Sequence, residues 1–403
     1  MGSVCFMALA SSSPVAVLRQ PHTARMLAGT IVGRLPAGMA PLAILLLVRS
    51  EGGSYALAGL LLSLYWLGAA AGGPALGRAV DRLGQQRSLI PSAVGSASAF
   101  ALLSVTGAEP VALSCGLATL AGLATPPLEP CLRALLPRLM RAGPPVESAY
   151  ALEVGAQELI FVLGPLIVVV LAGAVDEQVA FSACGVFALI GTGAFVTALP
   201  SREWRASRSS IRGGGPLRSP IVRLLVITAV QIGVAIGVLT VAATAFAEAH
   251  GSRTAAGWLL AIWSVAALAS GFWYSTLKPP NAPTRRLRWL LAYYALSFLP
   301  AIVAPSITVL AAILAIAGAS LSPLLAVVNE FVGRATPDTA TTEAFAWLVS
   351  GVVVGSALGS AYAGALIDAY NVSAAFASAA FVGATALLLW IREASFDVSG
   401  EAS

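Results

Sequence analysis

Long apolar stretches separated by short polar connections dominate the sequence. Each stretch has about 20 residues, the length that a helix needs to cross the hydrocarbon core of a bilayer. Twelve such stretches can be placed, at 26–48, 54–77, 88–107, 111–136, 149–173, 178–199, 221–247, 255–277, 287–304, 307–333, 343–368 and 373–391. The pattern predicts an all-α integral membrane protein with 12 transmembrane helices.

One connection is longer and more polar than the others. Residues 200–219 are rich in arginine and glycine, and they predict a cytoplasmic linker between two six-helix bundles. The predicted bundles cover 23–199 and 220–392, with a flexible tail at 1–22 and a second tail at 393–403. A weak internal repeat supports this division, because Pro127 corresponds to Pro323 and Gly164 corresponds to Gly359.

Composition and charge agree with a membrane protein and set its orientation. Hydrophobic residues make up 58% of the chain and charged residues only 10%, well below the proportion of charge in soluble domains. Arginines crowd the tails and the even-to-odd loops, whereas the opposite loops hold only Arg49 and Arg253 beside several acids. Cytoplasmic loops carry the excess of cations, so both termini are predicted to be cytoplasmic. The net charge of +5 therefore does not indicate nucleic-acid binding.

Other function classes find little support in the sequence. The four cysteines are scattered and the two histidines, His22 and His250, lie in a tail and an outer loop. No spacing predicts a metal site, a disulfide framework, a phosphate loop or a catalytic nucleophile, so we expect no cofactor, no metal and no enzymatic activity. An intramembrane hydrolase and a receptor or scaffold built on a transporter fold are the alternatives from other classes.

The connection between the second and third predicted helices carries the clearest motif, GRAVDRLGQQR. Its Gly77, Asp81, Arg82, Gly84 and Arg87 resemble the signature that the major facilitator superfamily has at this place, and the resemblance extends over about 20–392. It implies a 12-helix transporter, here expected to be bacterial, whose two bundles rock around a central cavity. In the family this motif latches the cytoplasmic sides of the bundles together. Physically, Gly84 permits a tight turn and Asp81 can cap a helix or pair with arginines.

A second stretch, GAQELIFVLGPL in the fifth predicted helix, is similar to part of the family's antiporter motif. Gly155, Gly164 and Pro165 match it, whereas its intermediate glycine and its terminal glycine pair are missing. The resemblance favours export over uptake. A proton symporter or a facilitator for uptake of a sugar or other metabolite is the alternative.

Five charged side chains lie in or near the predicted spans of the first six-helix bundle, and a charge inside a span costs about 2.5–3.5 kcal/mol on insertion scales. They are Arg34, Glu129, Arg133, Glu153 and Glu158. A low dielectric favours the neutral form of a carboxyl group, so a buried glutamate can carry a proton near neutral pH. We predict proton coupling at Glu158 first and at Glu129 second, with Arg34, Arg133 and Glu153 as charge partners or a substrate anchor. A fixed structural network of salt bridges is the alternative.

Further polar and aromatic positions are candidates for the cavity wall. They are Gln231, Asn329, Glu330, Trp263 and Trp347. Aromatic residues near span ends also form interfacial belts. Glu153, Arg133 and Glu330 can instead extend to the cytoplasmic interface, which is the simpler interpretation for these three.

Prolines and glycines predict local features of the spans. The stretch TPPLEPCLRALLP (125–137) is assigned to the inner half of the fourth helix, with a bend shared with the tenth helix at Pro323. Glycines repeat every four residues at 68 and 72, and at 351, 355 and 359, which allows close helix contact. We expect either static packing or a sliding contact between the halves there.

The prediction for function follows from these features. The chain is expected to be a secondary active transporter of a small organic molecule, working by alternating access and coupled to protons, with export preferred. Its expected partners are the substrate, protons and the lipid bilayer, without nucleic acid. We expect a functional monomer in the cytoplasmic (inner) membrane of the cell.

Overall fold

The computed structural model describes residues 14–140, 146–204, 218–277, 282–335 and 341–392, and these ranges contain helices but no strands. The helices are α2 (Pro14–Leu18), α3 (Thr23–Ser50), α4 (Tyr55–Leu83), α5 (Gln85–Thr106), α6 (Val111–Leu123), α7 (Leu128–Leu139), α8 (Val146–Ala174), α9 (Glu177–Val196), α10 (Leu199–Arg202), α11 (Pro220–Ala249), α12 (Ala255–Thr276), α13 (Pro283–Ser297), the 3-10 helix η3 (Leu299–Val303), α14 (Ile307–Ala335), α15 (Thr341–Ala369) and α16 (Val372–Arg392). The fold is all-α, as predicted.

Within the residues that the structure describes, eleven helical spans are long and apolar enough to cross a membrane. The twelfth predicted span, 287–304, is observed as α13 followed by η3, and α13 has only 15 residues. Three arginines near its start make α13 less apolar than its neighbours. It nevertheless packs against α14 and α16 as part of the same bundle. The protein is therefore a multi-pass membrane protein.

The termini and the linker are described only in part. Residues 1–13, 205–217 and 393–403 of the predicted tails and linker lie outside the described residues. Within the predicted flexible tail, α2 forms a short helix whose Val17 is buried in a cluster with Leu132 and Leu135. This part of the tail is packed, because Val17 belongs to that buried apolar cluster and α2 contacts α3 and α8.

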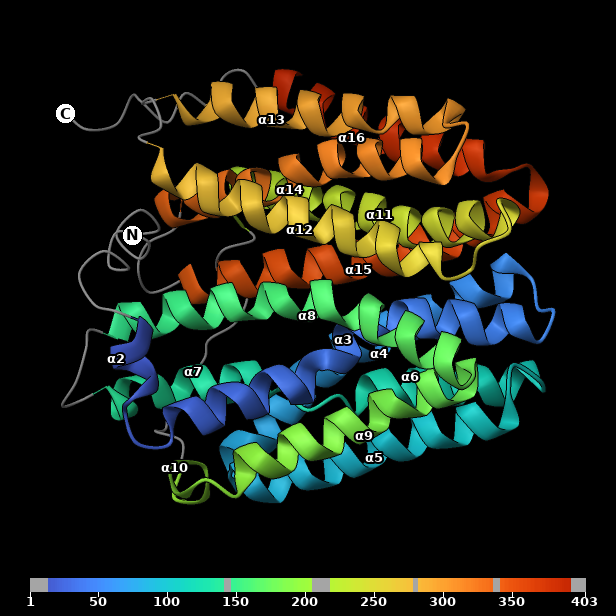
Figure 1. Cartoon of the computed structure of the whole chain (residues 1–403). Helices are drawn as coiled ribbons and strands as arrows, with labels where there is room; N and C mark the ends of the chain where they lie inside the picture. The colour runs from blue at the N-terminus through green and yellow to red at the C-terminus, as the bar shows by residue number, and fades with distance from the viewer. Residues whose placement is uncertain (1–13, 141–145, 205–217, 278–281, 336–340, 393–403) are drawn as a thin grey trace.

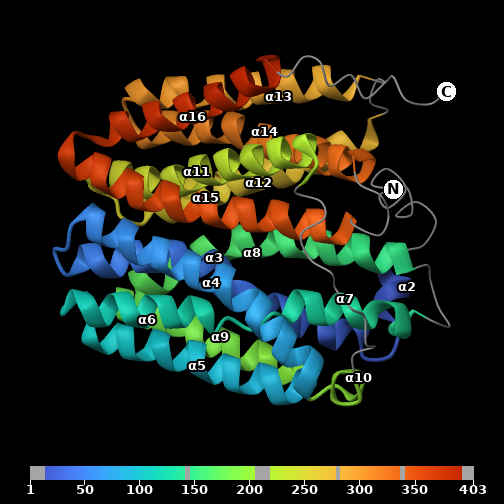
Figure 2. The ribbon, with the colours of Figure 1, turned by 180° about the vertical axis from the view of Figure 1, so that it is seen from behind.

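The helices form two groups that meet along two seams. In Figure 1 helices α3 to α9 occupy the lower part of the molecule and α11 to α16 the upper part, and the view from behind in Figure 2 shows the same division. Helix α4 packs against α15, and α8 packs against α12. We refer to the two groups as the first and second halves.

The fourth predicted span is broken, which corrects the expectation of one helix over 111–136. Helix α6 ends at Leu123 and α7 begins at Leu128, with Thr125–Pro127 outside regular helix. Proline has no amide to donate, and Pro126 and Pro127 come in succession. The Thr125 amide donates instead to the Gly122 carbonyl (3.0 Å) and the Leu128 amide to the Pro126 carbonyl (2.8 Å).

The expected bend in the tenth span does not take the same form. Helix α14 runs without interruption from Ile307 to Ala335, with Pro323 inside it. One isolated proline removes a single hydrogen bond, whereas the adjacent pair Pro126–Pro127 removes two in succession. The break is a property of the first half alone.

The repeated glycines pack within each half. A Cβ on Gly72 would lie 2.1 Å from the Leu123 carbonyl oxygen of α6, and one on Gly355 would lie 2.0 Å from the Val230 carbonyl oxygen of α11. These glycines make their contacts inside the halves rather than between them. The close approach between α4 and α15 uses Gly59 and Gly364 instead, where a Cβ would lie 2.3 Å from the Ser360 oxygen and 2.2 Å from the Tyr55 oxygen.

The internal repeat is visible in one matched contact. Gly164 of α8 packs on the backbone of Gly38 in α3, and Gly359 of α15 packs on the backbone of Val234 in α11. Both glycines let two helices of one half approach closely. The sequence correspondence of Gly164 with Gly359 therefore reflects the same structural role.

Candidate functional site

Five side chains form a closed ring of polar contacts in the first half. Arg34 Nη1 lies 2.6 Å from Glu129 Oε2, and Glu129 Oε1 lies 2.9 Å from Arg133 Nη2. Arg133 Nε donates to Glu153 Oε2 at 2.9 Å. Gln157 closes the ring, donating to Glu153 Oε1 and accepting from Arg34 Nη1 at 2.5 Å. Four of the five charged residues predicted in the first half, all except Glu158, thus meet in one site together with Gln157.

Local structure brings the three contributing helices together. Gly33 of α3 packs so closely on α7 that a Cβ there would lie 2.3 Å from Leu128 Cδ1. This contact places Arg34 next to Glu129, which lies in the first turn of α7 because the chain breaks just before it. The free amides of a helix N-terminus also favour a carboxylate there. On α8, Glu153 and Gln157 are four residues apart and share one face.

Burial differs strongly around the ring. The side chain of Glu153 is 1% exposed, whereas that of Arg133 is 42% exposed. Glu153 therefore does not extend to the interface, contrary to the simpler interpretation of the sequence, because its carboxylate is bound by Arg133 and Gln157 inside the bundle. Arg133 is the member of the ring that solvent reaches most easily.

The ring balances its own charge. Two arginines face two glutamates, and both oxygens of each carboxylate have a partner. Both carboxylate oxygens of Glu129 are therefore occupied by guanidinium groups, one from α3 and one from its own helix.

Glu158 stands apart from the ring. It is half-buried, and no ion pair or hydrogen bond joins its side chain to the residues that the structure describes. It lies seven and eleven residues before Pro165 and Val169, which share its face of α8. Both of these residues lie close to Gly257 of α12, which is a helix of the second half. Glu158 thus lies on the face of α8 that turns towards the other half.

The motif between α4 and α5 is exposed. Asp81, Arg82 and Arg87 all face solvent, and Asp81 makes no ion pair with any residue within the described ranges. Gly84 has φ 90°, a conformation that glycine adopts without strain, and it joins α4 to α5. Gly77 has open space around its α-carbon. Within the described part of the chain, Asp81 therefore makes none of the ion pairs expected of a closed latch.

The antiporter-like residues divide between two contacts. Gly164 packs on Gly38 inside the first half, and the carbonyl of Pro165 lies close to Gly257 across the seam between the halves. A Cβ on Gly155 would meet open space. Of these three residues, Pro165 is therefore the one that contacts the second half.

The predicted cavity residues of the second half are spread over different surroundings. Gln231 donates to Thr385 of α16 (3.0 Å), and Trp263 is buried with its indole Nε1 unpaired. Asn329 and Trp347 are exposed. Glu330 accepts from Arg286 and pairs with Arg334. The structure does not gather these five residues into one site.

A polar network between the halves was not predicted. Glu248 of α11 pairs with Arg49 of α3 (Nε–Oε2, 3.0 Å), accepts from the Tyr55 hydroxyl and accepts from Arg253 at 3.2 Å. The amides of Tyr55 and Ala56 donate to Asp368 of α15, at 3.1 and 2.6 Å. We call this end of the molecule the outer end. Its predicted loops contain only two arginines, Arg49 and Arg253, and these two exceptions were the signal in the sequence that could have indicated the network.

Comparison with known proteins agrees with the fold and with the motif. The family model described as Major Facilitator Superfamily matches residues 26–277 and 224–402. Comparison with curated proteins gave no match.

Two solved structures are similar along almost their whole length. A mutant of the nucleoside transporter NupG has a TM-score of 0.71 at 11% identity, covering 92% of this chain and 98% of its own. The human organic anion transporter MFSD10 (TETRAN) has a TM-score of 0.66 at 15% identity. The match covers 94% of this chain and 100% of the MFSD10 chain. At these identities the likeness concerns the fold. Because the family model spans nearly the entire chain, the protein belongs to the Major Facilitator Superfamily and is a transporter rather than an enzyme.

Proposed function

We propose that the protein is a proton-coupled secondary transporter that exports a small organic molecule across the cytoplasmic membrane, with Glu158 as the proton carrier. The unpaired, half-buried carboxylate of Glu158 carries this proposal. It lacks the two arginine partners that Glu129 has, and it faces the seam where the halves move relative to each other. A change in its protonation can therefore favour one orientation of the halves over the other.

The contacts between the halves support alternating access from a closed outer end. The polar contacts between the halves that are described above lie around Glu248 and Asp368, and Arg253 of the second half also pairs with Glu177 of the first at 3.9 Å. The exposed latch motif lies at the opposite end. We infer that this arrangement is an inward-facing state and that the Glu248 network opens when the transporter turns outward.

The polar ring is the proposed substrate anchor. Arg133 is its most exposed member and can exchange a contact to Glu129 or Glu153 for one to an anionic or hydrogen-bonding substrate. NupG is a nucleoside transporter and MFSD10 an organic anion transporter, so nucleosides and organic anions are the first substrates to screen. The partial antiporter motif favours export, and uptake by proton symport is the second candidate.

The proposal is tested with purified protein in proteoliposomes under an imposed pH gradient. Ligands are first selected by thermal stabilisation of the protein. We expect Glu158→Gln to retain ligand binding and lose the dependence of transport on the pH gradient. Glu203→Gln, which changes an exposed glutamate paired with Arg138, serves as the matched control and should behave as the wild type. Full pH dependence in Glu158→Gln would remove Glu158 as the proton carrier.

A further inference from the structure

Helix α13 presents an unusual face outside the bundle. Its residues Arg285, Trp289, Tyr293 and Leu296 are exposed, and they follow one another at helical spacing on a single side. Figure 1 shows α13 at the edge of the molecule. By the distribution of arginines the Arg285 end is cytoplasmic, so the face runs from a cation at the inner interface to apolar side chains at membrane depth.

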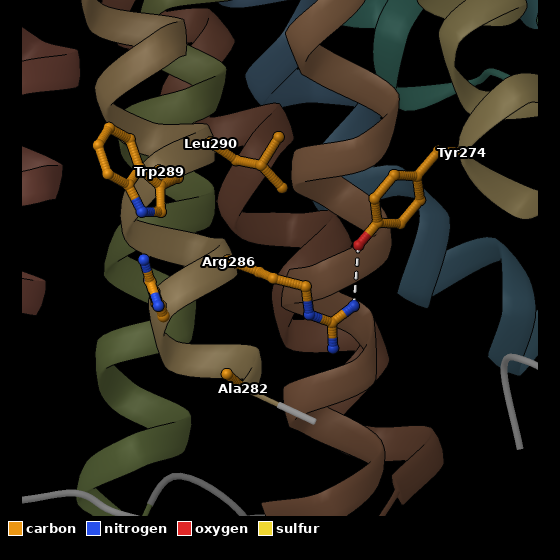
Figure 3. Close-up of a pocket in the computed structure, with 6 residues that line it drawn as sticks. Tyr274, Ala282, Arg286, Trp289 and Leu290 are labelled. Carbon is orange, nitrogen blue, oxygen red and sulfur yellow. Dashed lines mark hydrogen bonds between the residues drawn. The ribbon is translucent and has the colours of Figure 1, made fainter. Parts of the chain in front are cut away.

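A pocket of about 400 Å³ opens at the cytoplasmic end of this face. It is lined by Tyr274, Ala282, Arg285, Arg286, Trp289 and Leu290. Figure 3 shows Arg286 and Tyr274 joined by a hydrogen bond, with Trp289 and Leu290 on the adjoining turn of α13. Trp289 is 67% exposed, which is a large indole surface to leave without a partner unless lipid covers it.

The two arginines of the pocket differ in their bonding. Arg286 is held by Tyr274 (2.9 Å) and by both oxygens of Glu330 (3.0 and 2.8 Å), yet its Nε is buried without a partner. Arg285 is exposed and has no partner among the residues that the structure describes. Arg286 is therefore fixed inside the bundle, and Arg285 is the guanidinium that remains available at the mouth of the pocket.

The surroundings keep this corner strongly positive. Arg288 donates to the Trp390 carbonyl (3.0 Å) and Arg334 pairs with Glu330. Arg286 and Arg334 pair with Glu330, and Arg285 and Arg288 lie on the same first turns of α13, so these four positive charges and one negative charge sum to +3. Such a cluster at the cytoplasmic interface attracts an anionic group.

A second, apolar pocket continues along the same face of α13. It has a volume of about 220 Å³ and is lined by Tyr293, Leu296, Ser297, Pro300, Ile313 and Ile316. From Arg285 to Leu296 the helix rises by roughly 16 Å, at about 1.5 Å per residue. The pocket beside Arg285 is therefore followed, deeper in the membrane, by the apolar pocket at Leu296. The distance between these two residues along the helix is one that an extended acyl chain can span.

We propose that this face of α13 binds one anionic phospholipid of the inner leaflet. The phosphate is held by Arg285, since guanidinium groups bind phosphate oxygens with charge-assisted hydrogen bonds, and the net positive charge of the surrounding arginines adds to the attraction. Trp289 covers the glycerol region, and one acyl chain passes Tyr293 and Leu296 into the apolar pocket. The proposal is independent of substrate and of proton coupling.

Native mass spectrometry of the detergent-purified protein tests the proposal, with phosphatidylglycerol, phosphatidylcholine and inorganic phosphate added separately. We expect the wild type to retain one phosphatidylglycerol in preference to phosphatidylcholine. In the double variant Arg285→Gln/Trp289→Leu the affinity for phosphatidylglycerol should fall by at least about fivefold, the factor that corresponds to about 1 kcal/mol for one arginine at an anionic membrane surface.

The matched control is Arg223→Gln, which removes an exposed arginine of α11 from the same end of the second half without touching either pocket. It should bind phosphatidylglycerol as the wild type does, and both variants should keep the wild-type melting temperature in detergent without lipid. Three results would overturn the assignment to a phospholipid. The double variant could retain as much phosphatidylglycerol as the wild type, Arg223→Gln could lose as much as the double variant, or millimolar inorganic phosphate could displace the lipid.

Discussion

Glu153 is a charged side chain that is almost completely buried, and its partner Arg133 lies on another helix. Removing one partner of a buried ion pair leaves an uncompensated charge, which costs about 3–5 kcal/mol. We therefore expect Arg133→Met to lower stability by about that amount, measured by thermal unfolding in detergent.

The double variant Arg133→Met/Glu153→Gln checks the reason for the loss. With no charge left unpaired at Glu153, it should recover much of the stability lost in the single variant, apart from the lost contact of Arg133 to Glu129. If the single and double variants unfold at the same temperature, burial of the Glu153 charge is not what the pair compensates.

At the scale of helices, the contact between α3 and α8 depends on glycine. A Cβ on Gly164 would lie 2.5 Å from the carbonyl carbon of Gly38, and backbone on both sides leaves little room to adjust. We expect Gly164→Ala to destabilise the protein by about 1–3 kcal/mol through overpacking. Thermal unfolding measures this loss.

Gly155 provides the matched control, nine residues earlier in α8. Its Cβ would meet open space, so Gly155→Ala should be neutral or stabilise the helix by up to about 1 kcal/mol, the difference in helix propensity. Similar destabilisation by both substitutions would mean that the close contact at Gly164 is not the cause.

For the whole molecule, the Glu248 network should determine how often the outer end opens. Glu248→Ala removes its contacts to Arg49, Tyr55 and Arg253 together, and so weakens the contacts that favour the closed outer end. The distance between the two halves at this end can be measured by electron spin resonance, with labels at Glu109→Cys and Tyr370→Cys in a background without native cysteines. We expect the distance distribution of Glu248→Ala to gain a longer component.

The exposed pair Arg138–Glu203 supplies the control at this scale, because it joins residues of the first half only. Glu203→Ala should leave the distance distribution unchanged. An unchanged distribution in Glu248→Ala as well would show that the closed outer end is held by the helix contacts at Gly59 and Gly364 rather than by the charges.

The sequence by itself determined the class of the protein and most of its helices. A span must satisfy its backbone hydrogen bonds internally and cover itself with apolar side chains, so each helix is encoded locally and can be recognised from one stretch of chain. The correspondence of Gly164 with Gly359, the loop motif around Asp81 and the cost of charge at Arg34 and Glu158 were local signals of the same kind.

Only the tertiary structure decided which of those residues meet. The polar ring joins Arg34, Glu129 and Glu153 from three helices, and their rotation about their axes is set by glycine contacts such as Gly33 on Leu128. The outer network likewise pairs Arg49 with Glu248, nearly 200 residues away. Ion pairs depend on distance in space, which sequence spacing reveals within one helix but not between helices. Hence Glu129–Arg133 was foreseeable, whereas the isolation of Glu158 from the ring was not.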